Sequence, residues 1–216
     1  MGIRELQERY RSGERNFDGS DFSRLDLSRI VLSEASLNRT NLFRTDLLLA
    51  QLEKSNLSYA VACRVNLSGA NLTGAILRAT DLYMANLNGA KLDQANLSKA
   101  YLRGADLTRA GLSGADLSGA NLIEANLYGA NLTGANLRGA FLIVANLRGA
   151  ILTGADLTET NLIGANLTGV NLQETILTDA ILPQDASEPP LRRAQLTMPP
   201  TPTNPELIEE IFGIQS

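Results

Sequence analysis

Histidine and tryptophan are absent from this 216-residue chain, and it contains a single cysteine, Cys63. Without histidine, imidazole acid–base catalysis and histidine-containing metal sites or triads are excluded. One cysteine excludes an intramolecular disulfide and is consistent with a reducing compartment. An enzyme would have to use carboxylates, lysine, tyrosine or the lone thiol, and the sequence presents no catalytic, metal-binding or cofactor-binding cluster. We therefore expect a protein that is not an enzyme and that needs no cofactor.

Long apolar runs and a large net charge are also lacking. No apolar run approaches the roughly 20 residues that span a bilayer. The charged N-terminal sequence MGIRELQERYRSG has no apolar centre of the kind that a secretory signal needs. A formal net charge of −4 gives no sign of a general nucleic-acid or anionic-membrane binder. These absences predict a cytoplasmic protein that binds neither nucleic acid nor membranes.

A five-residue repeat fills most of the chain. Every residue whose number ends in 2 or 7, from Phe17 to Leu182, is leucine or phenylalanine, with Ala62 the only exception among 34 pentads. In each pentad this large residue is position three. Position one is Ala, Ser, Thr or Val in 31 of the 34, and position two is Asn or Asp in 22. A period of five fits neither an α-helix nor a long strand.

The pentad is explained by a short extended segment followed by a corner. Positions one and three lie two residues apart and so point to the same side, one small and one large, while position two points away. Positions four and five then form the corner. Position five holds 14 of the chain's 18 glycines, and a type II turn favours glycine at its third residue because φ is positive there.

The tandem A(D/N)LXX pattern resembles the pentapeptide repeat family over residues 15–184. This resemblance implies an all-β fold, a right-handed quadrilateral parallel β-helix in which four pentads make one 20-residue coil. Thirty-four pentads would give about 8.5 coils, with position three stacked inside beside the small position one. Ala62 should leave a void unless a neighbour compensates. The N-terminal sequence LQERYRSGERNF is most similar to cyanobacterial members.

The two ends of the chain depart from the repeat. Residues 1–14 are expected to contain a capping helix at 2–12, because Ile3, Leu6 and Tyr10 share one helical face. Residues 185–216 form a Pro-rich tail, since all seven prolines lie between positions 183 and 205. Near its end NPELIEEIF predicts a short helix that begins at Asn204. Its apolar side would hold Leu207, Ile208, Ile211 and Phe212.

Side chains 20 residues apart should stack on one wall of the tower, and the walls differ. The amide wall, centred on Leu27 and every twentieth residue to Leu167, carries Asn or Asp at each position two. We expect these amides to bond along the axis as a solvated structural ladder. This ladder comprises Asp26, Asp46, Asn66, Asn86, Asp106, Asn126, Asn146 and Asn166.

The apolar wall, centred on Phe22 and every twentieth residue to Leu182, carries large apolar side chains at outward positions. A contiguous apolar stripe on a protein surface usually marks an interface. The candidate protein-binding residues are Phe43, Val61, Tyr83, Tyr101, Ile123, Phe141, Ile143, Val144 and Ile163. The stripe fits a protein partner or a weak homodimer. Alternatively, the tail covers it with Leu207, Ile211 and Phe212, or it is ordinary surface variation.

Three arginines stack one coil apart at the base of the apolar wall: Arg24, Arg44 and Arg64. They are candidates for contacting an anionic group of a partner, although a solvated basic face is the simpler interpretation. Cys63 is expected to point outward beside Arg64, where an adjacent cation can lower the pKa of a thiol.

Two functions follow from these patterns. The first is a non-enzymatic interaction or regulatory scaffold, and the resemblance implies the same class because relatives include a regulator of heterocyst differentiation in cyanobacteria. The second is mimicry of DNA, as in family members that bind DNA gyrase. Such mimics need a strongly acidic surface, whereas residues 17–182 carry 15 acidic and 13 basic side chains. The sequence therefore favours the scaffold.

Overall fold

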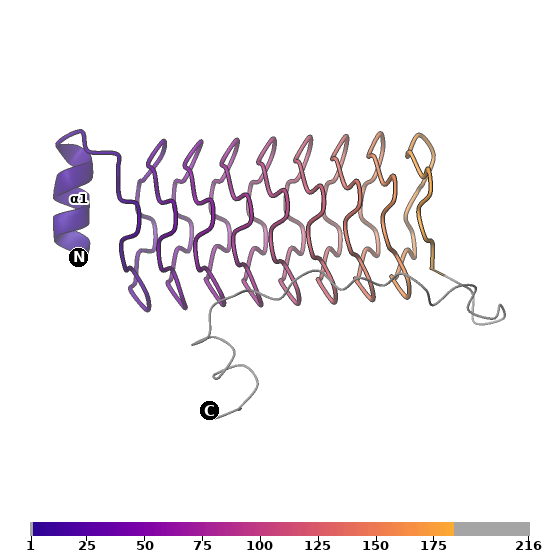
Figure 1. The fold of residues 1–216 in the computed structure, drawn as a ribbon, viewed down its shortest axis with the longest axis horizontal. Coiled ribbons are helices and arrows are strands. Elements are labelled where there is room, and N and C mark those ends of the chain that lie inside the picture. The colour runs from indigo at the N-terminus through magenta and orange to yellow at the C-terminus, as the bar shows by residue number, and fades with distance from the viewer. Residues whose placement is uncertain (1, 184–216) are drawn as a thin grey trace, which may run out of the picture.

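The computed structural model describes residues 2–183. One helix, α1 (Ile3–Arg11), precedes a long run of short extended segments. Figure 1 shows that these segments form near-identical coils stacked along one axis, with α1 at the N-terminal end of the stack. The expected tail at 185–216 and its terminal helix lie outside the described residues.

Parallel β-bridges hold each coil to the next. Every bridge joins a position-two residue to the residue 20 positions later, from Asn16 with Ser36 to Asn161 with Ile181. Because a corner follows each bridge at once, no segment grows into a longer strand. The repeat length of four pentads per coil therefore follows from the hydrogen-bond register.

Within a pentad the backbone satisfies four N–H groups, and a side chain satisfies the fifth. In the pentad at 120–124, the N–H groups of positions two, three and five bond to adjacent coils, and that of position one closes the preceding corner. The N–H of position four, Ile123, instead donates to Oδ1 of Asn121 at 3.2 Å. The same contact recurs throughout the tower, for example from Ser23 to Asp21 at 2.9 Å. Asn or Asp at position two is thus the acceptor for the one backbone N–H, that of position four, which has no backbone acceptor.

The interior is a column of leucines with small residues beside them. Position-three side chains in the middle of the tower, such as Leu122, are fully buried, and so are their alanine neighbours. Burying one leucine contributes about 1.5–3 kcal/mol relative to leaving it exposed. Ala62 is buried too, next to Val65, which is larger than the usual alanine at position one. Towards the C-terminal end Leu177 is only half-buried and Leu182 is exposed.

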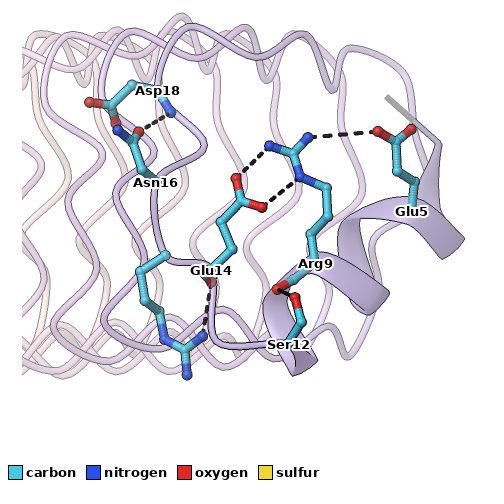
Figure 2. Close-up of polar contacts among 7 residues, drawn as sticks. Glu5, Arg9, Ser12, Glu14, Asn16 and Asp18 are labelled. Carbon is cyan, nitrogen blue, oxygen red and sulfur yellow. Dashed lines mark hydrogen bonds and ion pairs between the residues drawn. The ribbon is translucent and has the colours of Figure 1, made fainter.

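The N-terminal helix buries one residue completely. Leu6 has no exposed surface and joins the core cluster, against which Ile3 and Tyr10 also pack. The Tyr10 hydroxyl donates to the Ser33 carbonyl at 3.0 Å. Figure 2 shows Arg9 between Glu5 and Glu14, with its Nε donating to Glu14 Oε2 at 2.8 Å. These hydrogen bonds from Arg9 lower the pKa of Glu14.

The predicted corner is confirmed. Position five has a φ between +52° and +76° in every described pentad from Gly19 to Asp179. The sequence fills 19 of these corners with residues other than glycine, although the left-handed conformation costs an L-residue about 1–2 kcal/mol. Val144, with φ of +59°, is the one β-branched residue among the non-glycine corners in the described residues, and this residue type tolerates the conformation least.

We expect Val144→Gly to stabilise the tower by about 1 kcal/mol, since the relief of strain exceeds the added freedom of the unfolded chain. The reverse change, Gly139→Val, is the matched control: its φ is +62° and a Cβ there would meet no atom within 4 Å. It should lower stability by about 1–2 kcal/mol through strain alone. Urea unfolding followed by circular dichroism measures both. A lower midpoint for Val144→Gly would contradict the strain argument.

Candidate protein-binding surface

Position-two residues of the apolar wall form one continuous row. Bridges connect Asp21 to Asn41 and then each residue to the next as far as Ile181. From Val61 onward apolar and polar residues alternate along this row. In chain order the row reads Val61, Asp81, Tyr101, Asn121, Phe141, Asn161 and Ile181.

The polar members of the row are buried by the large side chains above and below them. Asp81, Asn121 and Asn161 are all less than 10% exposed. Each accepts the N–H of its own position four, at 3.1 Å from Tyr83 to Asp81 and from Ile163 to Asn161. In these pentads position two therefore supports the backbone, while position four presents the apolar side chain.

The apolar members of the row give up that support. Tyr101 and Phe141 have no Asn or Asp oxygen to offer the N–H of Arg103 and Ile143. A backbone hydrogen bond is worth about 0.5–1.5 kcal/mol net, so each apolar pentad carries a local cost. On the amide wall every position two keeps Asn or Asp, so none of these acceptors is replaced by an apolar side chain. The amides there also bond along the axis, as from Asn146 Nδ2 to Asn126 Oδ1 at 2.9 Å.

The structure places the candidate protein-binding residues on the expected wall at different depths. Ile123 is buried, while Val144 and Ile163 are exposed by 59% and 38%. The other six are half-buried: Phe43, Val61, Tyr83, Tyr101, Phe141 and Ile143. The surface is a packed apolar face with exposed residues at its corners.

Exposed apolar side chains also occur on the remaining walls, more widely than the sequence suggested. They are Val31, Leu49, Tyr59, Ile76, Tyr128, Ile151 and Ile176. None of these stands in a row like that of Tyr101, Phe141 and their neighbours. Contiguity, not exposure alone, distinguishes the apolar wall.

The three candidate anion-contacting arginines, Arg24, Arg44 and Arg64, are exposed at the same corner of three successive coils. Two of them gather around one aromatic ring, since the guanidinium carbons of Arg24 and Arg44 lie 5.6 and 5.1 Å from the Phe43 ring centroid. Such cation–π contacts offset part of the repulsion between stacked like charges. Farther along the wall Arg103 pairs with Glu124 at 3.2 Å.

Cys63 lies on the apolar wall, outside the core cluster of leucines and alanines, but the expectation that its thiol is exposed with a lowered pKa is wrong. Cys63 is buried at 1% exposure, because Phe43 and Tyr83 occupy the same position in the coils before and after it. Burial raises the pKa of the thiol far above its ordinary value, and the nearby Asp81 carboxylate, which accepts a hydrogen bond from the thiol, raises it further. Arg64 does not reverse this effect.

Asp81 is the residue of this wall that sequence reasoning missed. Burial raises the pKa of its carboxyl, although hydrogen bonds from Cys63 and the Tyr83 N–H work in the opposite direction. Asp81 in turn contributes to a raised pKa of Tyr101, whose own burial is the larger cause. The sequence could have indicated the burial of Asp81, because large apolar residues stand 20 positions before and after it.

Within residues 2–183 no group of three or more Cys, Asp or Glu side chains is arranged to hold a metal ion. In the same part of the chain, no helix has the length and apolar character needed to cross a membrane.

Stacked 20-residue coils, each made of four pentads and joined to the next by parallel bridges, define a solenoid of the β-helix class. A family model described as pentapeptide repeats matches in eight copies, over residues 16–47, 49–83, 85–122, 112–143, 125–162 and 142–179. The chain therefore belongs to the pentapeptide repeat family. Members of known structure form right-handed quadrilateral β-helices.

Several solved structures are similar. HetL, a pentapeptide repeat protein involved in heterocyst differentiation regulation from Nostoc sp. strain PCC 7120, is 34% identical over 85% of this chain and 98% of its own, with a TM-score of 0.40. Rfr23 from Cyanothece 51142 is 29% identical over 84% and 99%, with a TM-score of 0.32. QnrB1, a plasmid-mediated fluoroquinolone resistance protein, is 18% identical over 77% and 91%, with a TM-score of 0.56, which shows a shared fold alone. A comparison with curated proteins finds no match.

The buried carboxyl of Asp81 predicts a specific pH dependence. Because its pKa is raised in the folded chain, the folded state holds a proton that the unfolded state has released, so stability falls as pH rises from the ordinary value of 3.8 through the folded pKa. Asp81→Asn keeps the acceptor for the Tyr83 N–H and removes the charge. We expect this variant to be more stable than the parent at pH 7 and equal to it at pH 3.

The matched control is Asn121→Asp, which places a carboxyl at the equivalent buried position two coils further along the wall. It should introduce the same loss of stability with rising pH. Urea titrations at a series of pH values measure both variants. Parallel pH profiles for the parent and Asp81→Asn would show that Asp81 carries no such penalty.

Proposed function

We propose that this chain is a non-enzymatic interaction or regulatory scaffold, which presents the apolar wall to a protein partner. The observation that carries the proposal is the convergence of two local costs in one pentad. Phe141 gives up the acceptor for the Ile143 N–H, and Val144 places an exposed β-branched side chain at a left-handed corner. Departures from the local rules of a fold are expected at functional sites.

The tower suits this role because its wall is ordered before any partner arrives. In a solenoid each coil contacts only its neighbours, and the outward side chains are held on a rigid frame. Binding to such a frame loses little conformational freedom, which favours affinity. Among the similar proteins, HetL is involved in the regulation of heterocyst differentiation, which favours a regulatory role.

The spacing of the apolar row suggests how a partner fits. Tyr101 and Phe141 lie two coils apart, which corresponds to about 10 Å at the usual spacing between strands. Residues seven apart on an α-helix are separated by about 10.5 Å along its axis. A partner helix that lies along the tower could therefore place one apolar side chain beside each of the two aromatic rings.

We expect Phe141→Arg combined with Tyr101→Arg to abolish association with a partner or with a second copy, while circular dichroism retains the β signature. The matched control, Ile151→Arg with Ile76→Arg, places the same charges at exposed apolar residues of other walls and should leave association unchanged. Affinity capture from the native cell and analytical ultracentrifugation measure the two forms of association. If the wall variant still associates as the parent does, the apolar wall is not the interface.

Mimicry of DNA is the second candidate, and the charge of the tower argues against it. A DNA mimic must reproduce a regular array of negative charge, whereas residues 17–182 differ by only two between acidic and basic side chains. We expect no effect of the purified chain on supercoiling by DNA gyrase, and no protection of the enzyme from quinolones. Inhibition of supercoiling at micromolar concentration would favour the mimic over the scaffold.

A further inference from the structure

The two ends of the tower differ in how far their inward side chains are buried. At the N-terminal end, where Figure 1 shows α1 across the stack, Phe17 and Leu27 are only 2% exposed. In the last described coil the position-three residues are partly buried or exposed: Leu167, Leu172, Leu177 and Leu182. The apolar interior of the described chain is therefore covered at one end and open at the other.

The backbone of the last coil is open in the same direction. In inner coils the N–H groups of positions three and five donate to the next coil, as from Leu147 to the Asn166 carbonyl at 2.9 Å. Within residues 2–183 the equivalent N–H groups of the last coil have no acceptor: Leu167, Gly169, Leu172, Glu174, Leu177 and Asp179. An unpaired edge and an exposed core at the end of a solenoid require a cap.

The last coil is also loosened on one wall, that of Leu172. Each earlier position two of this wall is bridged to the next, as far as Asn131 with Ile151. Ile151 and Asn171, both among the described residues, form no bridge, and the Leu152 N–H does not donate to the Asn171 carbonyl. A layer stacked on this wall would give the last coil a second neighbour, and contacts between neighbours are what stabilise a solenoid.

The open end is acidic. Residues 149–183 contain no lysine or arginine and four acidic side chains: Asp156, Glu159, Glu174 and Asp179. Glu174 and Asp179 are exposed at corners of the last coil. An occupant of this end should therefore be apolar and carry positive charge. A second copy that met this chain end to end would bring carboxylates against carboxylates, so the charge disfavours that occupant.

We propose that residues 189–198, PPLRRAQLTM, close this end in cis as two further pentads. Counted in fives from Pro189, Leu191 and Leu196 fall at position three. The second pentad, AQLTM, also has a small residue at position one and an amide at position two. Leu191 stands one residue short of the register of Leu182, so a count at fixed intervals of five misses both pentads.

The tower already contains the less usual residues of the second pentad. Glutamine occupies position two at Gln51, and methionine occupies position five at Met84. In the first pentad, Pro189 and Pro190 have no N–H to donate. They stand at the start of the added layer, where proline is found in strands, and the carbonyl of Pro190 can still accept a hydrogen bond.

The length of the intervening chain places the added pentads over Leu172 and Leu177. Residues 185–188 would cross the wall of Leu167, and four extended residues reach about 13 Å, more than the extended part of one pentad needs. The carbonyls of positions two and four in the added pentads would then accept the N–H groups that the last coil leaves open on the next two walls.

The charge of the added pentads also matches the open end. Arg193 would lie one coil above Glu174, because both take position five. Such pairs already occur between coils, as between Arg103 and Glu124 at 3.2 Å. Residues 205–212, the other apolar segment beyond the described chain, carry three glutamates and no basic residue, so they have the sign that the end repels.

Disulfide cross-linking of the full chain tests the register of the added pentads. Glu174→Cys with Arg193→Cys, and Asp179→Cys with Met198→Cys, each place two thiols at position five of stacked pentads. Stacked segments lie about 4.8 Å apart, within the range of Cα separations that a disulfide spans. Cys63 is buried and the pKa of its thiol is raised, so it should not compete.

The crossed pairs are the matched controls, Glu174→Cys with Met198→Cys and Asp179→Cys with Arg193→Cys. They use the same four positions on neighbouring walls, and their sequence separations lie on either side of that of the stacked pairs. Under mild oxidation we expect the stacked pairs to close at least ten times faster, as measured by mass spectrometry of tryptic peptides. Crossed pairs that close as fast would overturn the proposal. Disulfide-linked dimers in place of internal cross-links would assign the end to a second copy and would overturn it as well.

Hydrogen exchange measured by NMR tests the closure without added cysteines. Leu191→Asp with Leu196→Asp removes the two inward side chains of the added pentads. We expect the N–H groups of Leu172 and Leu177 to exchange at least tenfold faster in this variant than in the parent, because their acceptors are lost. Both chains should keep the β signature in circular dichroism. The same exchange rates in the two chains would contradict the proposal.

The matched control, Leu207→Asp with Ile211→Asp, alters the other apolar segment and should leave both exchange rates as in the parent. Faster exchange in this control alone would assign the end to residues 205–212 and overturn the proposal. The inference is independent of the proposed function. Phe141→Arg with Tyr101→Arg should leave the cross-linking rates unchanged, so either proposal can fail while the other stands.

Discussion

One amide in each pentad has no backbone acceptor, and the rest of the structure is arranged around it. Four N–H groups per pentad bond within the coil or to its neighbours, and only position four needs a side chain. Asn or Asp at position two supplies the acceptor from only two residues earlier in the sequence, as Asn121 does for Ile123. The backbone N–H of position four therefore accounts for the preference for these two residues, and a departure such as Phe141 changes a backbone hydrogen bond as well as the surface.

The interior was largely predictable from the sequence because its rules are local. The period of five, the alternation of small and large inward residues and the glycine-rich corner each follow from the geometry of one pentad. The bridges between residues 20 positions apart then repeat that geometry without slippage from Asn16 to Ile181. Even the corners without glycine, such as Val144, adopt the predicted left-handed conformation, because the coils on both sides leave them no alternative.

The depth of the outward side chains was not predictable from one pentad. Cys63 is buried because aromatic residues stand one coil before and after it, and Asp81 is buried because Val61 and Tyr101 do. The pKa of each group is then raised by that burial, and each influences the other. Exposure on a solenoid wall is a property of three stacked residues, so it must be read from the sequence at intervals of 20.

A solenoid can tolerate a wall whose outward residues lower local stability, because its overall stability is spread over many coils. Each coil gains its stability from its own leucines and from two neighbours. A lost hydrogen bond at Phe141 or strain at Val144 therefore lowers stability only locally, by about 1 kcal/mol. The inward residues of the same pentad, Ala140 and Leu142, stay fully in register and buried. Selection can therefore alter the outward residues of one wall without disturbing the core, provided that the altered face is used. Along this row apolar residues recur in every second pentad, and the pentads between them carry Tyr83, Ile123 and Ile163 at position four.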